Sequence, residues 1–198
     1  MHTRAMPFDL RVTVPPVLEP VTLDEAKAQC RVDGTADDTF ITGLIGRARE
    51  YVEKLDWRAC LTQTLELWLP RWPCDKIVLP RPPLASVTSV EYYDTDDVKY
   101  TLDPAIYYVN AIAEPGEIVL RYNQTWPTTT LRDYNAVCVT YVAGWTAAAN
   151  VPKTIKQAVL LVIGHWYENR EASTVGAVSR EIELGVRALI NLDRMKRF

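Results

Sequence analysis

The sequence predicts an α+β protein in which a helical body carries an inserted, small antiparallel β subdomain. Two observations predict this class. Strongly amphipathic helices are expected at about 38–56 and 153–170, and about ninety residues of short, proline-punctuated strands lie between them. Each long helix has an apolar face that must be buried. We therefore expect the two helices to pack on each other and the strand block to be an insertion between them.

Residues 1–20 predict an extended N-terminal arm. The arm contains four prolines, which exclude a helix and disfavour a central strand: Pro7, Pro15, Pro16 and Pro20. An arm of this kind is either disordered or lies across a neighbouring element. The remaining boundaries follow from the periodicity: a helical body at 21–57 and 151–192, the β insertion at 58–150, and a C-terminal tail at 193–198.

Four helices are expected, at about 22–31, 38–56, 153–170 and 184–192. Thr22 and Glu25 have the spacing of a capping box at the start of the first helix, and Asp37 or Asp38 caps the second. The apolar stripe of the second helix comprises Phe40, Ile41, Leu44, Ile45, Ala48, Tyr51, Val52 and Leu55. The other face of this helix comprises Arg47, Arg49, Glu50, Glu53 and Lys54.

The third helix starts with Pro152 in its first turn, where proline is tolerated. Its buried stripe comprises Ile155, Ala158, Val159, Val162, Ile163, Trp166 and Tyr167. Leu160 and Leu161 widen this apolar surface, so we expect a second packing partner. Gly43 and Gly46 lower the helix propensity of the second helix and predict the close approach of another backbone.

Between the long helices the hydrophobic period changes to two. The expected strands lie at 65–69, 77–79, 87–93, 98–102, 107–110, 118–122 and 136–142. Asp94–Asp97 and Glu114–Glu117 predict the turns of two hairpins. Short strands at this spacing indicate one small antiparallel sheet or barrel.

Composition narrows the class of function. The 198 residues carry a net charge of −3, which disfavours a protein that wraps nucleic acid by neutralising phosphates. The four cysteines are far apart in sequence and do not form a zinc motif, so reduced thiols are expected. The N-terminus has no apolar signal region, and the longest apolar run, 158–164, is too short to span a membrane. We expect a soluble protein made inside the cell, without membrane association.

The candidate chemical sites are weak. His165 could be a general base, but no nucleophile motif accompanies it, so a structural histidine is favoured. Asp94, Asp96 and Asp97 could bind a cation, but the glycine and glutamate of a calcium loop are missing, so an acidic turn is favoured. We expect no catalytic, cofactor-binding or metal-binding residue.

Two other features raise the possibility of interfaces without deciding it. Aromatic side chains are concentrated in the strand block: Trp68, Trp72, Tyr92, Tyr93, Tyr107, Tyr108, Trp126 and Trp145. Aromatic side chains on a small sheet mostly form its core. This many of them in one block of short strands is also consistent with contacts to partner proteins. From Arg180 onward, five Lys or Arg face three Asp or Glu, so this end is locally basic. The simplest interpretation is a tail exposed to solvent. The more specific hypothesis is a tail that docks into an acidic groove on a partner protein.

Several segments, taken in order, resemble a known family. They are Pro20–Lys27, Asp37–Glu53, Leu79–Asp94, Val139–Gly144 and Val151–Glu171, and Leu184–Ile190 fits the closing short helix. Together they resemble the head–tail connector (adaptor) proteins of tailed phages, in the branch with a strand insertion, which also occur in gene transfer agents. The resemblance covers about residues 20 to 192, and none of its motifs is catalytic.

The resemblance implies a ring, usually of twelve subunits, in the neck of a phage or gene transfer agent particle assembled in the host cytoplasm. The ring lies between the portal protein and a stopper or tail-completion protein, and DNA passes through its lumen. The negative net charge agrees with a lumen that does not hold DNA.

The resemblance also implies that the C-terminal segment inserts into the portal. The expected portal-binding residues are Leu184, Arg187, Leu189, Arg194, Met195, Lys196, Arg197 and Phe198. As a docking tail, residues 184–198 should contribute little to the stability of the protomer.

Two other classes remain open. One is a small intracellular enzyme, a hydrolase or a nucleic-acid-modifying enzyme, whose site is built from scattered carboxylates. The other is a monomeric binding module, which does not explain the wide apolar face of 153–170 or the basic tail.

Overall fold

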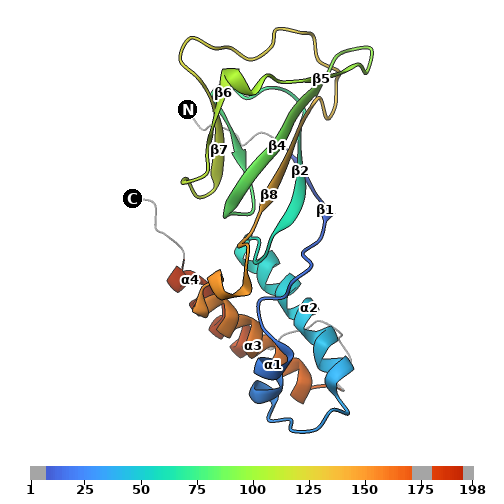
Figure 1. The fold of residues 1–198 in the computed structure, drawn as a ribbon, viewed down its shortest axis with the longest axis vertical. Helices are drawn as coiled ribbons and strands as arrows, with labels where there is room; N and C mark the ends of the chain where they lie inside the picture. Colours follow the sequence, from blue (N-terminus) through green and yellow to red (C-terminus); the bar gives the residue numbers. More distant parts are fainter. Residues whose placement is uncertain (1–7, 171–179, 194–198) are drawn as a thin grey trace. The chain divides into compact units, whose positions relative to one another are not determined.

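The computed structural model describes residues 8–170 and 180–193, which form two compact units. Figure 1 shows the elements of both units. The β unit comprises residues 8–16 and 62–144. The helical unit comprises residues 17–61, 145–170 and 180–193. Each unit is therefore assembled from segments that are separated in sequence.

The helical unit contains four α-helices: α1 (Leu23–Cys30), α2 (Asp38–Asp56), α3 (Lys153–Glu168) and α4 (Arg180–Asp193), with a short 3₁₀ turn η2 (Ala148–Asn150). The predicted capping box is confirmed, because Thr22 Oγ1 accepts the Glu25 amide and Glu25 accepts the Thr22 amide. Helix α4 begins at Arg180, four residues before the predicted start at 184. The additional turn brings Ile182 against the core.

The core of the helical unit lies between α1, α2, α3 and α4. It contains the predicted stripes of the two long helices, including Ile41, Leu44, Val52, Val159 and Ile163. Helix α4 adds Val186 and Ile190, and it supplies the second partner that the wide face of α3 requires. Packing against neighbours, more than intrinsic propensity, stabilises helices of this length.

The prediction that Gly43 and Gly46 mark a close backbone approach is wrong for this unit. The nearest atoms to a Cβ at these positions are the side chains of Arg47 and Glu19, at 3.4 and 3.5 Å. The polar face of α2 is only partly exposed. Arg49 and Glu53 are buried, although their neighbours Arg47 and Glu50 are exposed.

The β unit contains two antiparallel sheets where the sequence predicted one. The larger has the order β1-β2-β8-β4-β5 and the smaller β3-β7-β6. The strands are β1 (Asp9–Val14), β2 (Gln63–Leu69), β3 (Lys76–Leu79), β4 (Leu84–Tyr93), β5 (Lys99–Thr101), β6 (Tyr107–Asn110), β7 (Gly116–Leu120) and β8 (Val137–Ala143), with a 3₁₀ turn η1 (Pro104–Ile106). Both predicted hairpins, β4–β5 and β6–β7, are confirmed.

Strand β1 comes from the segment predicted as an extended arm. It pairs with β2 and forms one edge of the larger sheet, where its flanking prolines are tolerated. Of the two alternatives for the arm, residues 9–14 follow the second: they lie along a neighbouring element, as a strand of the sheet.

The two sheets approach closely at Gly116 in β7. A Cβ at this position would lie 2.5 Å from Leu84 Cδ2 in β4, so only glycine fits the contact. The buried side of the larger sheet includes Leu65, Leu67, Val139 and Tyr141. Tyr141 donates its hydroxyl to the Pro80 carbonyl at 2.7 Å, which satisfies the one polar atom of this large buried side chain.

Candidate interaction surfaces

Helix α4 carries the part of the predicted portal-binding segment that the structure describes. Leu184 is 61% exposed, and Arg187 pairs with Glu183 one turn earlier at 2.7 Å. Leu189 is partly buried and packs against the helical core. The other predicted residues, Arg194, Met195, Lys196, Arg197 and Phe198, lie outside the described residues.

The inner side of α4 corrects the expectation that residues 184–198 contribute little to stability. Val186 and Ile190 are fully buried in the helical core. Removing a buried aliphatic side chain of this size usually costs about 2–5 kcal/mol. Helix α4 is therefore a structural helix with one exposed side, which presents Leu184 and Leu192.

A polar clasp joins the start of α2 to the end of α3. Asp37 accepts hydrogen bonds from the Tyr167 hydroxyl at 2.6 Å and from Arg170 at 2.8 Å. The Arg170 guanidinium also lies over the rings of Tyr167 and Phe40, with centroid distances of 4.3 and 4.6 Å. The bonds from Arg170 and Tyr167 hold the pKa of Asp37 below its usual value. Asp37 is the cap residue of α2 as predicted, but its side chain makes no capping hydrogen bond.

A buried ion network lies along α2. Arg49 contacts Glu19 at 2.9 Å and Glu53 at 3.0 Å, and Glu53 also accepts the Cys60 amide at 2.8 Å. Burial opposes the charge of Arg49, but the fields of Glu53 and Glu19 outweigh it and raise its pKa. The spacing of Arg49 and Glu53, four residues apart, is the sequence signal for this pair. The network ties the segment before α1 and the segment after α2 to one helix.

Aromatic side chains of the β unit form two groups. In the first, Trp72 stacks on Trp126 at 4.8 Å and meets Tyr92 edge-on, and Tyr92 stacks on Tyr100. In the second, Trp68 stacks on Tyr93, and Arg132 lies 4.0 Å from the Tyr93 ring centroid. Most of the concentrated aromatics therefore pack on one another. Tyr108, Tyr122 and Tyr134 are exposed.

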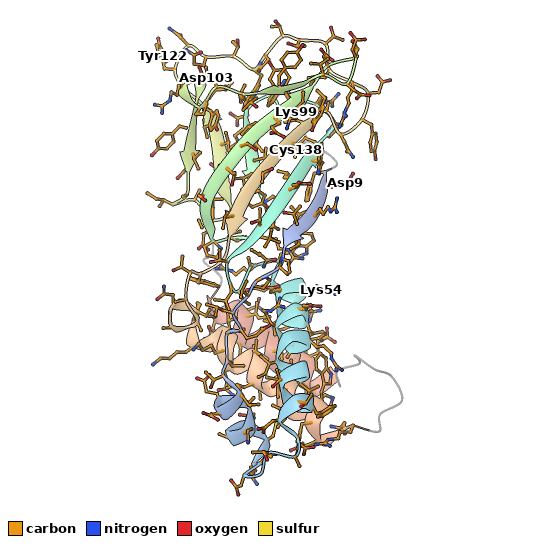
Figure 2. All side chains as sticks on the ribbon, turned by 45° about the vertical axis from the view of Figure 1, so that its right-hand side comes forward. Asp9, Lys54, Lys99, Asp103, Tyr122 and Cys138 are labelled. Carbon is orange, nitrogen blue, oxygen red and sulfur yellow. The ribbon has the colours of Figure 1, made fainter. Side chains whose placement is uncertain are left out.

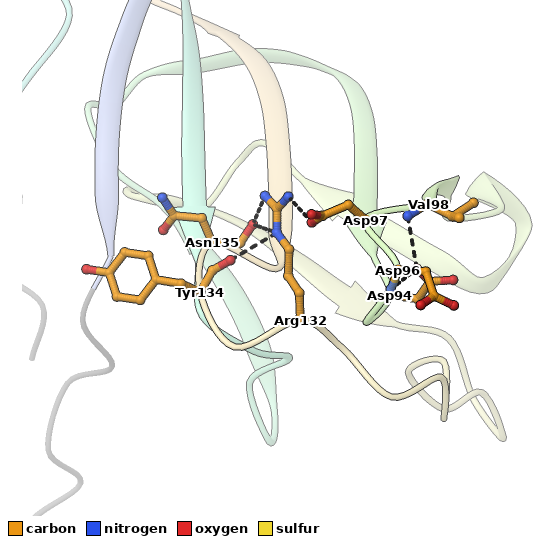
Figure 3. A network of polar contacts seen from close by, with 7 residues as sticks. All are labelled: Asp94, Asp96, Asp97, Val98, Arg132, Tyr134 and Asn135. Carbon is orange, nitrogen blue, oxygen red and sulfur yellow. Dashed lines mark hydrogen bonds and ion pairs between the residues drawn. The ribbon is translucent and has the colours of Figure 1, made fainter.

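The acidic sequence between β4 and β5 forms a turn, as predicted. Asp94 accepts the amides of Asp96 and Val98, both at 2.9 Å, and these bonds help to lower its pKa. Asp97 pairs with Arg132, which also donates to the carbonyls of Tyr134 and Asn135 (Figure 3). Arg132 thus fixes the long connection before β8 against the hairpin turn.

The remaining sequence candidates have ordinary surroundings. His165 is half-buried near the end of α3, with Nδ1 3.2 Å from the Asn169 side-chain nitrogen. All four cysteines are free thiols, and burial raises the pKa of Cys138 to about 12. In residues 8–170 and 180–193, no group of three His, Cys, Asp or Glu side chains is arranged to hold a metal ion. Within the same ranges, the helices lack the length and apolar character that a membrane crossing requires.

Comparison with known proteins decides the family. The model of the family described as head completion protein matches residues 19–181. The chain belongs to the head completion protein family. The match includes all of α1, α2 and α3 and every strand except β1. No curated protein matches the sequence significantly.

Solved structures share the fold of this head completion protein. A chain from the virion of a native gene transfer agent particle has a TM-score of 0.74 at 21% identity, with 96% of each chain covered. A chain from the neck of an empty gene transfer agent particle, computed with C6 symmetry, has a TM-score of 0.74 at 22% identity, covering 98% of this chain and 97% of that one. A third, from the neck of the native particle computed with C12 symmetry, has a TM-score of 0.68 at 21% identity, with 98% and 97% covered.

Proposed function

We propose that this head completion protein is a structural head–tail adaptor in the neck of a phage or gene transfer agent particle. Copies of the chain form a ring, of twelve subunits, between the portal protein and a stopper or tail-completion protein. DNA passes through the lumen without sequence-specific binding, which the net charge of −3 favours. The observation that carries the proposal is the family match over residues 19–181, supported by a fold shared with neck proteins over nearly the whole chain.

The C-terminal segment is the proposed portal-binding element. Exposed Leu184 and Arg187 on α4, together with Arg194, Met195, Lys196, Arg197 and Phe198, supply apolar and basic contacts. The buried Val186 and Ile190 hold α4 to the helical unit, so the docking contacts start from a fixed helix. Because α4 is already ordered, fewer residues lose conformational entropy when the segment binds.

Native mass spectrometry of the purified chain, with and without the cognate portal, tests the ring and the portal contact. The intact chain should form a closed ring alone or on the portal. Deleting Asp193–Phe198 should leave the melting temperature nearly unchanged and weaken portal association, and binding by the intact chain should fall as salt rises. A chain that forms no ring in either condition would refute the adaptor function.

A matched pair of substitutions separates docking from stability. Leu184→Ala should weaken portal binding, whereas Leu18→Ala, at a position of similar exposure in the same unit, should not. Undiminished portal binding by both Leu184→Ala and the truncated chain would move the portal contact to another surface.

A further inference from the structure

Strands β1 and β5 are the two edge strands of the larger β sheet, no further strand of the described residues pairs with either, and each has an apolar side chain on the same face of the sheet. Directly paired residues of antiparallel strands share a face. The pairing runs Val12↔Leu65, Leu65↔Tyr141 and Leu67↔Val139, so Val12 of β1 belongs to the buried face of the sheet. At the other end, Val137↔Tyr92 and Tyr92↔Tyr100 place Tyr100 of β5 on that same face. Val12 is 41% exposed and Tyr100 40% exposed.

The opposite face of these edges carries complementary charges. Asp9 and Arg11 of β1 pair with Trp68 and Glu66 on the outer face of β2. Lys99 of β5 is half-exposed and contacts Glu91 of β4 at 3.1 Å. Figure 2 labels Asp9 and Lys99, at the two edges of the sheet. One edge therefore offers a carboxylate and the other an ammonium group.

Strand direction also matches. The five strands of the larger sheet are antiparallel at every step, so the first and the last, β1 and β5, run in the same direction. Neighbouring subunits of a ring are related by a small rotation, which preserves strand direction. The β5 edge of one copy would thus meet the β1 edge of the next as a parallel pair.

We infer that β5 of one copy pairs with β1 of the neighbouring copy, so that the larger sheets join around the ring. This inference rests on the proposed ring. In the pairing, Tyr100 lies beside Leu10 and Val12 of the neighbour and continues the apolar face across the boundary. Lys99 lies beside Asp9 of the neighbour. The outer backbone groups of an edge strand can pair with a strand of another chain, and the proposed contact uses both edges of the sheet in this way.

A hollow at the start of β1 fits the same contact. Its lining is Phe8, Asp9, Trp68, Pro70, Tyr134 and Asn135. Val98 precedes Lys99 and is exposed, so with Lys99 beside Asp9 it comes next to Phe8, one of the residues that line this hollow. An extended segment that adds a strand and places side chains in adjoining pockets is a common recognition mode.

Cysteine cross-linking tests the register. Adjacent strands lie about 4.8 Å apart, within the Cα separation that a disulfide accepts. In a Cys74→Ser background, which removes the exposed native thiol, the double variant Asp9→Cys/Lys99→Cys should give a ladder of covalent oligomers on oxidation of the assembled ring. Each single variant should give no ladder. The matched control Asp9→Cys/Lys76→Cys, with the second thiol on the edge strand β3, should also give none.

Edge charges test the contact independently. Val12→Lys and Val98→Lys should each weaken ring association by about tenfold or more, because each places an unpaired charge in the proposed interface between β5 and β1 of neighbouring copies. Val78→Lys is the control: Val78 is 41% exposed on the edge strand β3 of the smaller sheet, and its substitution should leave association unchanged. Melting temperatures would show that each variant is folded.

The outcomes are distinguishable. A ring that forms normally but yields no ladder from the Asp9→Cys/Lys99→Cys variant, and that tolerates Val12→Lys, overturns the sheet pairing and leaves the adaptor function standing. A chain that forms no ring alone or with the portal refutes the adaptor function, and the pairing with it.

Discussion

At the scale of single residues, the helical unit contains charged side chains that are buried although they lie outside the apolar stripe of α2. Arg49 lies on the polar side of α2 by sequence, but its guanidinium is buried between Glu19 and Glu53. Removing one member of a buried ion pair leaves the other charge without compensation, whereas removing an exposed charge changes little.

We therefore predict that Arg49→Ala lowers the free energy of unfolding by about 3–5 kcal/mol. Arg47→Ala, an exposed arginine two residues earlier on the same helix, should change it by less than about 0.5 kcal/mol. Urea unfolding followed by circular dichroism at 222 nm measures both. Equal, small effects would mean that Glu53 and Glu19 are stabilised without Arg49.

The clasp at Asp37 makes a prediction about pH. Its lowered pKa means that the bonds from Tyr167 and Arg170 stabilise the folded state when Asp37 is ionised. The melting temperature of the wild type should exceed that of Asp37→Asn at neutral pH. This difference should shrink as the pH falls below the ordinary aspartate range and through the lowered pKa of Asp37.

Thermal melts between neutral and acidic pH measure the difference. Asp33→Asn, at an exposed loop position nearby, is the control and should show no comparable pH-dependent difference. A constant gap between wild type and Asp37→Asn at all pH values would contradict the ionic nature of the clasp.

At this scale, the sequence predicts contacts between residues close in the chain, but not contacts between residues far apart in it. Thr22 and Glu25 are three residues apart, so their capping box could be predicted and is confirmed. The acidic turn at Asp94 is equally local. The partners of Asp37 are 130 and 133 residues away, and no spacing rule connects them.

At the scale of elements, the long helices and both hairpins followed from periodicity and turn residues. The division into two sheets did not, because short strands give no signal for which partner they choose. Strand β1 was missed as a sheet member for a related reason: four prolines dominate residues 1–20, and its partner β2 begins at Gln63. The sequence predicts the start of α4 at residue 184, too late by one turn, because three of the four residues 180–183 are charged and extend no apolar stripe.

The burial of α4 gives a test at this scale. Ile190→Ala should lower the free energy of unfolding by about 2–5 kcal/mol, the usual cost of a buried aliphatic truncation. Leu192→Ala, on the same helix but 76% exposed, should cost less than about 0.5 kcal/mol. Denaturant unfolding of both variants measures the contrast. If Ile190→Ala left the free energy of unfolding unchanged, α4 would not be part of the stable core, as expected for a free docking segment.

At the scale of the whole molecule, each unit has its own core, and the ends of the β insertion meet within the helical unit. Leu61 and Trp145 form an isolated parallel bridge there. A short connection between these two residues can therefore replace residues 62–144 without displacing α2 or α3.

We predict that a chain of residues 17–61 joined by a short Gly-Ser linker to 145–198 folds as a helical protein. Its circular dichroism should show a helical spectrum with cooperative thermal unfolding, because the core of α1 to α4 is complete. A non-cooperative transition would show that the helical unit needs the β unit to fold. The full-length chain under the same conditions is the reference.

The interleaving of the two units has a consequence for synthesis on the ribosome. Strand β1 and helices α1 and α2 are made before β2 to β8, and none of them can complete a core when it emerges. The β unit is complete once β8 ends at Ala143, whereas the helical unit waits for Ile190 near the end of α4. Nascent domains usually mature from the N-terminus onward. Here the β unit can complete its core before the helical unit does, and the apolar stripe of α2 is not fully covered until α4 has been made.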